Sequence, residues 1–206
     1  MARSPDHPIA SLFVDRWSPR SFSAEAVPDA VLLSAFEAAR WAPSALNAQP
    51  WRFLLARPGD DAWETFAGLL MPRNRQWAGR AVALIVILSD KTPDRRGERV
   101  VNVAHGFDAG AAWANFAHQA LLLGWHTHAI GGFDRAEARA VLAVPDDFAV
   151  EAMIALGRQG AIETLHADFH EQESPNGRRP IAGSVFGGRF GAPSALSSAT
   201  QERTAA

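Results

Sequence analysis

Two short segments near the start of the chain carry residue types that suit a phosphate and a flat, polar-edged ring. The first segment is Arg16-Trp17-Ser18-Pro19-Arg20, which sets two guanidinium groups and a hydroxyl within five residues. A phosphate monoester is held best by charge-assisted donors, and arginine presents such donors as a planar fork. Solvated surface arginines ahead of a helix produce the same spacing, so the pattern alone leaves both interpretations open.

The second segment, residues 41–53, reads as a loop of small and amide side chains closed by prolines and flanked by tryptophans. It contains Pro43-Ser44-Ala45-Leu46-Asn47, followed by Gln49-Pro50-Trp51. The Asn47 side chain offers both a donor and an acceptor, which could pair with a ring edge that also carries both. The alternative is a tight connection between a helix and a strand.

Hydrophobic spacing predicts a mixture of helices and strands around these segments. Pro28 suits a first helical position, and Pro43 would stop the helix that follows it. The continuously apolar run 81–88 is typical of a strand buried on both faces. The predicted helices cover 28–42, 61–70, 106–123 and 135–142, and the predicted strands cover 53–56, 81–88, 125–130 and 150–156.

The predicted helix 106–123 is apolar most of the way round, so it must be buried on most sides, and a subunit interface would bury it. After Gly157 the periodicity is lost, and residues 158–192 read as an extended arm lying over another surface. We expect a single domain over residues 7–192, and a disordered tail over the small and polar residues 193–206.

Composition excludes several classes of function. The chain has 206 residues, 48% of them hydrophobic and 20% charged, with a net charge of -2, which is globular composition without a basic face for nucleic acid. It has no cysteine, so disulfides, thiolate catalysis and iron–sulfur sites are excluded. No run is long enough to span a bilayer and no signal peptide is visible, so we expect a cytoplasmic protein without membrane contact.

Taken together, the two segments resemble the nitroreductase family of FMN-dependent oxidoreductases, and the resemblance extends over residues 7–191. It implies an α+β fold with a central, mostly antiparallel sheet flanked by helices. It also implies a homodimer in which a C-terminal arm extends over the partner subunit. The resemblance further implies a ping-pong reaction in which NAD(P)H reduces FMN, and the flavin then reduces an electron-poor acceptor such as a nitroaromatic or a quinone.

The resemblance also implies roles for particular residues. The first segment would hold the phosphate and ribityl chain of FMN, with Arg20 near the pyrimidine edge, where its charge would raise the reduction potential. The second segment would reach across the dimer to the flavin of the other subunit. The residues expected to contact FMN are Arg16, Trp17, Ser18, Arg20, Pro43, Ser44, Ala45, Asn47, Asn74, Gly131, Gly132 and Arg189.

Four members of this set lie outside the two segments. Asn74 would contact the flavin ring, and the Gly131-Gly132 turn would give a backbone N–H to the N5 region, since glycines let a backbone approach a ring closely. Arg189, in the arm, would return to the phosphate. The alternative for Asn74 is an exposed polar residue at the start of a helix, and without the other motifs the two glycines would be interpreted as a plain turn between a strand and a helix.

Several alternatives stay open. No catalytic side chain is assigned, because the cofactor supplies the chemistry. A flavin storage or sensor protein, a family member with specialised flavin chemistry, and a scaffold that has lost flavin are the competing functions. The pairs His126/His128 and His166/His170 could ligate zinc, but neither has a third ligand at a motif spacing, so we expect no metal.

Overall fold

A computed structural model describes residues 3–196 and divides them into two compact units. The larger unit comprises Asp15–Ser174, and the smaller unit combines residues 3–14 with residues 175–196. Each unit is described by itself below. Residues 197–206, most of the predicted disordered tail, lie outside the described residues.

The larger unit is built on a four-stranded sheet in which every neighbouring pair is antiparallel. Its strands, in the order β1-β2-β6-β5, are Trp51–Ala56, Ala83–Asp90, Phe148–Gly157 and His126–Ile130. Leu54 pairs with Val86, and Ile85 pairs with Ile154. This arrangement confirms the predicted α+β class with an antiparallel central sheet.

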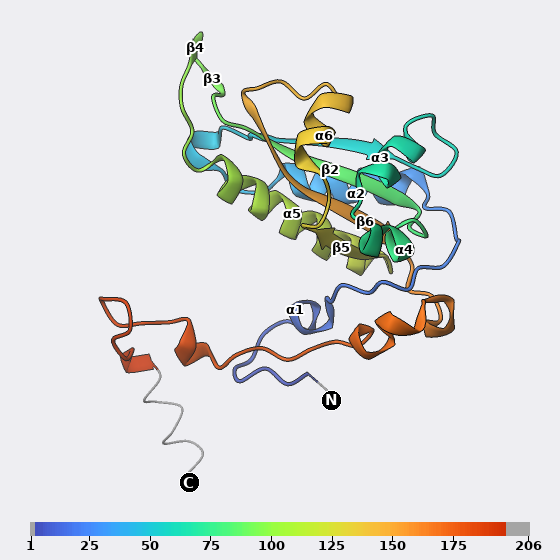
Figure 1. The fold of residues 1–206 in the computed structure, drawn as a ribbon. Helices are drawn as coiled ribbons and strands as arrows, with labels where there is room; N and C mark the ends of the chain where they lie inside the picture. The colour runs from blue at the N-terminus through green and yellow to red at the C-terminus, as the bar shows by residue number, and fades with distance from the viewer. Residues whose placement is uncertain (1–2, 197–206) are drawn as a thin grey trace. The chain divides into compact units, whose positions relative to one another are not determined.

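Helices cover both faces of this sheet (Figure 1). One face carries α2 (Asp29–Arg40) and α5 (His105–Leu122), and the other carries α3 (Trp63–Leu69), α4 (Pro72–Ala78) and α6 (Arg135–Val141). The shorter elements are α1 (Ser11–Asp15), the hairpin β3–β4 (Asp94–Arg95 and Glu98–Arg99), and single 3-10 turns at Ala45–Asn47, Ile162–Thr164, Ala167–Gln172 and Ile181–Gly183.

The predicted elements recur in the structure with ends shifted by one or two residues. The prediction for Pro28 was wrong in detail, because Pro28 is the N-cap of α2 and not its first helical residue. Its backbone is extended, at φ -66° and ψ 144°, while its carbonyl accepts the first helical hydrogen bond, from Leu32. The sequence pattern did not predict α1 or the β3–β4 hairpin, since both are too short to show a period.

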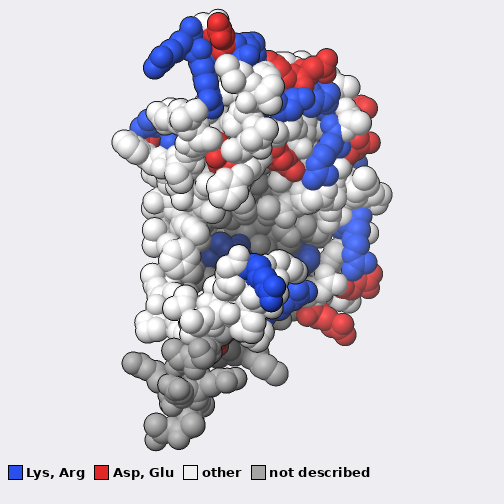
Figure 2. Space-filling view, turned by 90° about the vertical axis from the view of Figure 1, so that its left-hand side faces the viewer, with Lys and Arg blue, Asp and Glu red and all other residues white. Residues whose placement is uncertain are grey.

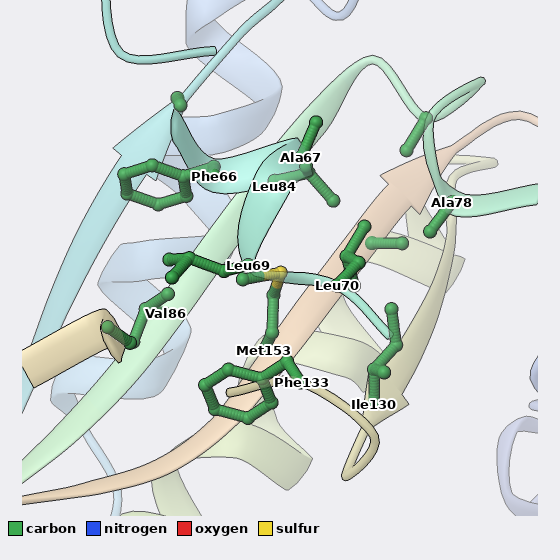
Figure 3. Packing of buried hydrophobic residues seen from close by; sticks show 14 of the residues in the cluster. Phe66, Ala67, Leu69, Leu70, Ala78, Leu84, Val86, Ile130, Phe133 and Met153 are labelled. Atoms are coloured by element: carbon green, nitrogen blue, oxygen red, sulfur yellow. The ribbon is translucent and has the colours of Figure 1, made fainter. Parts of the chain in front are cut away.

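All eight residues of β2 are buried, as predicted for the run 81–88, so the sheet has a separate hydrophobic cluster on each face. On the face of α3, α4 and α6, Phe66, Phe133 and Met153 pack together with leucines from α3 and β2 (Figure 3). On the other face, the Phe116 ring of α5 lies 5.1 Å from Phe36 and 6.3 Å from Phe53, measured between ring centroids.

Helix α5 uses only part of its apolar surface within the described unit. Ala109, Ala112 and Phe116 face the sheet and are buried, whereas Phe107 is 84% exposed and Leu122 is 65% exposed. Apolar side chains at both ends of one helix are therefore left for contacts beyond this unit.

The face drawn in Figure 2 carries acidic side chains among the basic ones, so it does not form one continuous basic patch. Over residues 3–196, every helix is too short or too polar to cross a bilayer.

His128, on β5, is packed tightly between the sheet and the start of the larger unit. Its ring centroid lies 4.5 Å from that of Trp77, and its Nδ1 lies 3.0 Å from the Pro19 carbonyl oxygen. Because a carbonyl can only accept, Nδ1 carries the proton and donates it. Burial lowers the pKa of His128 to about 4, with the charge of Arg20 adding to the effect, against the hydrogen bond to Pro19 and the charge of Glu173.

The lowered pKa predicts that acid destabilises the protein through His128. Below pH 6.5 His128 becomes protonated in the unfolded chain, but in the folded chain it stays neutral down to about pH 4. The free energy of unfolding therefore decreases as the pH is lowered from 6.5 to about 4. We expect a contribution of up to about 3 kcal/mol, given about 1.4 kcal/mol per pKa unit. Urea unfolding at pH 7 and pH 4.5 should show a smaller acid loss in H128N than in the wild type.

The exposed His7 supplies the matched control, since H7N should keep the wild-type acid loss. An H128N variant that loses as much stability as the wild type between the two pH values would contradict the role given to His128.

Candidate functional site

The segment Arg16–Arg20 begins the larger unit and is anchored by Trp17, whose side chain is only 8% exposed. The residues on either side of Trp17 stay partly exposed, and Arg16 Nη1 donates to Ser18 Oγ over 3.2 Å. The structure therefore brings a guanidinium and a hydroxyl of this segment together, as a phosphate cradle requires.

The residues that follow are bound along the end of β6 and the loop after it. Ser23 N donates to the Arg158 carbonyl over 2.9 Å, and Gly160 N donates to the Ser21 carbonyl over 2.9 Å. Phe22 is fully buried, and its ring packs so closely on Gly157 that a Cβ there would lie 2.7 Å from the ring. These contacts hold the segment Arg16–Arg20 in one position.

The Arg20 side chain is partly buried and lies over the Trp77 ring. Its guanidinium carbon is 5.8 Å from the centre of the Trp77 ring, and Nη1 donates to the Gln172 carbonyl over 3.3 Å. Burial lowers the pKa of Arg20, and so does the neighbouring Arg73, while Glu173 raises it. Arginine remains a cation under such shifts, so Arg20 is a fixed positive charge beside α4.

The predicted residues Asn74 and Gly132 meet directly, although they are far apart in the sequence. Asn74 Nδ2 donates to the Gly132 carbonyl over 2.8 Å, and Met71 N donates to the same oxygen over 3.1 Å. A Cβ on Gly132 would lie 2.4 Å from Asn74 Nδ2, so only glycine allows this contact.

The neighbouring Gly131 is open on the side where a side chain would stand, with no atom within 4 Å of a Cβ built there. Its carbonyl is held by Arg135, whose Nη1 donates to it over 3.0 Å while Nη2 donates over 3.0 Å to the Glu151 carbonyl. The turn after β5 is thus clamped through its carbonyls, which leaves an open backbone surface at Gly131.

The loop Pro43–Asn47 is held in an unusual backbone conformation. Leu46, Asn47 and Gln49 have φ values of 52°, 57° and 47°, in the left-handed region that non-glycine residues rarely adopt. Two contacts hold the loop: Ala45 N donates to Asp108 Oδ2 over 3.1 Å, and Gln49 N donates to Ser44 Oγ over 3.0 Å. Backbone strain of this kind gathers at ligand-binding sites.

The predicted site residues therefore form two groups within the larger unit. The segment Arg16–Arg20, α4 and the end of β5 are brought together through the contacts of His128, Trp77 and Asn74. The loop Pro43–Asn47 is instead attached to α5 through Asp108. Arg189 belongs to the smaller unit, so its return to the phosphate stays a prediction.

Two supporting residues were missed by sequence reasoning. Asp108 is 3% exposed, and it was visible as a lone acidic residue in an apolar helix. Glu173 accepts hydrogen bonds from Arg20 and Ser21, but it lies in a stretch without periodicity, where nothing in the sequence marks it.

Within residues 3–196, no three histidine, aspartate or glutamate side chains gather as a metal ion would need. The histidine pairs raised as zinc ligands therefore have no third partner among the described residues.

The donors present fit FMN. A guanidinium and a hydroxyl lie together for a phosphate, Arg20 supplies a fixed cation, and the Asn74 amide binds Gly132, next to the open backbone of Gly131. The chemistry of this set matches the phosphate at one end of the cofactor and the polar edge of the ring at the other.

Comparison with known proteins identifies the family of this chain. The model of the nitroreductase family matches residues 14–158. An uncharacterised 15.4 kDa protein of Mycolicibacterium smegmatis is 35% identical over 69% of this chain and 99% of that protein. An NADH dehydrogenase of Thermus thermophilus is 29% identical over 69% of this chain and 82% of that protein.

Among solved structures, an oxidoreductase containing FMN superimposes with a TM-score of 0.89. It is 42% identical and covers 92% of this chain and 96% of its own. The family match spans well over half of the chain and includes the sheet and most of the predicted site residues. The chain belongs to the nitroreductase family.

Proposed function

We propose that this protein is an FMN-dependent oxidoreductase that uses NAD(P)H to reduce electron-poor acceptors such as nitroaromatics or quinones. The observation that carries the proposal is the contact between Asn74 and Gly132, beside the fixed charge of Arg20. It joins α4 to the turn after β5, two segments that the family uses for flavin. The 42% identity to an oxidoreductase containing FMN supports the same cofactor.

Different residues of the chain would bind different parts of the cofactor. Arg16 and Ser18 would bind the phosphate, with the Trp17 backbone beside the ribityl chain. Asn74 would meet the polar edge of the ring through its free carbonyl oxygen, because its amide nitrogen already donates to Gly132. Gly131 and Gly132 would present backbone to the N5 region.

Bound FMN would supply the hydride chemistry that couples oxidation of NAD(P)H to reduction of the acceptor in two steps. Arg20 would stabilise the negative charge of the reduced ring, because its guanidinium is already oriented and partly desolvated. The protein positions the ring, sets its potential and leaves one face accessible, so no side chain is assigned a proton-transfer role.

A homodimer completes the proposed site. The Asp108 contact attaches the strained loop Pro43–Asn47 to the end of α5 that carries the exposed Phe107, and both would meet the partner subunit. The loop would then reach the partner's flavin, the arm would extend over the partner, and Arg189 would approach the phosphate. We also propose that the enzyme is cytoplasmic.

The proposal is tested by the visible spectrum of the purified protein under anaerobic conditions. We expect flavin absorption near ~450 nm, a property of the cofactor itself, which NADH or NADPH bleaches and a nitroaromatic or quinone restores. Protein that stays colourless after FMN is added would refute the cofactor. Bound flavin that neither nucleotide bleaches would point to storage, sensing or specialised flavin chemistry.

The close contact at Gly132 predicts a specific effect on flavin affinity. In G132A the new methyl group must displace the Asn74 amide, which removes one hydrogen bond and misplaces the ring contact. We expect FMN to bind about threefold to tenfold more weakly, the value of about one hydrogen bond. Fluorescence titration of FMN into the apoprotein measures the change.

Gly68 on α3 provides the control, because a Cβ there meets no atom within 4 Å. G68A should bind FMN as the wild type does. Equal affinities for G132A and the wild type would show that Asn74 and Gly132 do not contact the flavin.

The charge of Arg20 predicts a change in reduction potential. In R20A the reduced flavin loses its stabilising cation, so the two-electron midpoint potential should fall, by about 30 mV for each tenfold loss of relative affinity. Titration against redox dyes measures it. R75A is the control, since Arg75 is an exposed residue of α4 paired with Glu64. A potential unchanged in R20A would remove Arg20 from this role.

A further inference from the structure

The Glu173 carboxylate accepts several hydrogen bonds from Arg20 and Ser21. Its Oε1 accepts from Arg20 N over 3.1 Å, from Ser21 N over 2.9 Å and from Ser21 Oγ over 2.6 Å. Its Oε2 accepts a further bond from Arg20 N over 2.9 Å. One carboxylate therefore takes both backbone N–H groups and the hydroxyl of two consecutive residues, including the residue that carries the proposed flavin charge.

These bonds are stronger than ordinary surface contacts. Ser21 is 1% exposed, so its hydroxyl and N–H would be left unsatisfied if the carboxylate were removed. Bonds to an ionised acceptor are roughly twice as strong as neutral ones. Glu173 also follows Gln172, whose carbonyl accepts from Arg20 Nη1, so both ends of Arg20 are held by the same turn.

The charge of Glu173 acts on several basic side chains. Arg20 belongs to the segment that Glu173 binds, and His126 and His128 lie on β5, while Arg73 of α4 acts on Arg20. Burial lowers the pKa of Arg20, His126 and His128, and in each case the charge of Glu173 acts in the opposite direction. The negative charge of Glu173 therefore acts on all three groups, and it offsets part of the positive charge that Arg20 presents.

We propose that Glu173 is a positioning residue that fixes the backbone of Arg20 and limits how strongly the site favours reduced over oxidised FMN. This inference rests on the proposed function. It assigns two separable effects to one side chain: the hydrogen bonds place the cation, and the negative charge moderates it.

The two effects predict different results for different substitutions. Glutamine keeps an acceptor oxygen but removes the charge, so in E173Q the positive charge near the ring increases and the more negative, reduced flavin binds relatively better. Aspartate keeps the charge but shortens the reach, so in E173D the Arg20 segment loosens while the charge balance is retained. Glu171, an exposed residue two positions away, gives the control E171Q with the same change in net charge.

The experiment compares the midpoint potential and the FMN dissociation constant of the full-length holoproteins. In E173Q we expect the ratio of affinities for reduced and oxidised FMN to rise about threefold to tenfold, as expected for one charge at short range. This ratio corresponds to an upward shift of about 14 to 30 mV for a two-electron couple. E171Q should stay at the wild-type potential, because an exposed charge is screened.

In E173D we expect weaker FMN binding with the potential near that of the wild type. This pair of results distinguishes the proposal from a purely structural role, which would weaken binding in both variants without moving the potential of E173Q. E173D also provides the test if E173Q does not fold, since a potential displaced in E173D as far as in R20A would overturn the proposal.

Failure of the inference is distinguishable from failure of the proposed function. Wild-type protein that binds FMN and is reduced by NAD(P)H, together with an unshifted E173Q, would overturn the role of Glu173 alone. Wild-type protein that does not bind FMN would overturn both.

Discussion

The burial of β2 on both faces is the constraint on which the larger unit depends. Eight consecutive residues of this strand are inaccessible to water, so helices must cover both sides of the sheet. The strand pairs with β1 on one side and β6 on the other, which leaves β5 at the far edge. The end of β5 is therefore free to turn at Gly131 and Gly132 and to meet α4, where the candidate site lies.

The candidate site depends on close contacts between segments that are far apart in the sequence. Gly132 admits the Asn74 amide because it has no side chain, and Gly157 admits the Phe22 ring for the same reason. These contacts bring the start of the unit and the ends of β5 and β6 to α4. A flavin bound here would be held by segments whose positions are set by the core, which suits a site that must place a ring accurately.

Electrostatic balance is a second organising feature. The region of Arg20 and Glu173 also contains Arg73 and two histidines whose pKa values burial lowers, His126 and His128, and the carboxylate of Glu173 offsets part of the Arg20 charge. In the proposed function, Arg20 would influence the reduction potential of the flavin, which requires a cation that is held in place and only partly neutralised. The bonds of Glu173 to backbone N–H groups meet both conditions, because they restrain the chain without a direct bond to the guanidinium.

The sequence by itself determined the main helices and strands and the types of donors. The apolar run 81–88 predicted a strand buried on both faces, because that pattern is local, whereas the spacing of Arg16, Ser18 and Arg20 became a predicted phosphate site only through the family resemblance. Only the tertiary structure decided which distant residues meet. Asn74 contacts Gly132, Ala45 contacts Asp108, and Arg20 contacts Glu173. Each contact depends on how strands and helices pack together, and the local spacing of apolar residues carries no information about that packing.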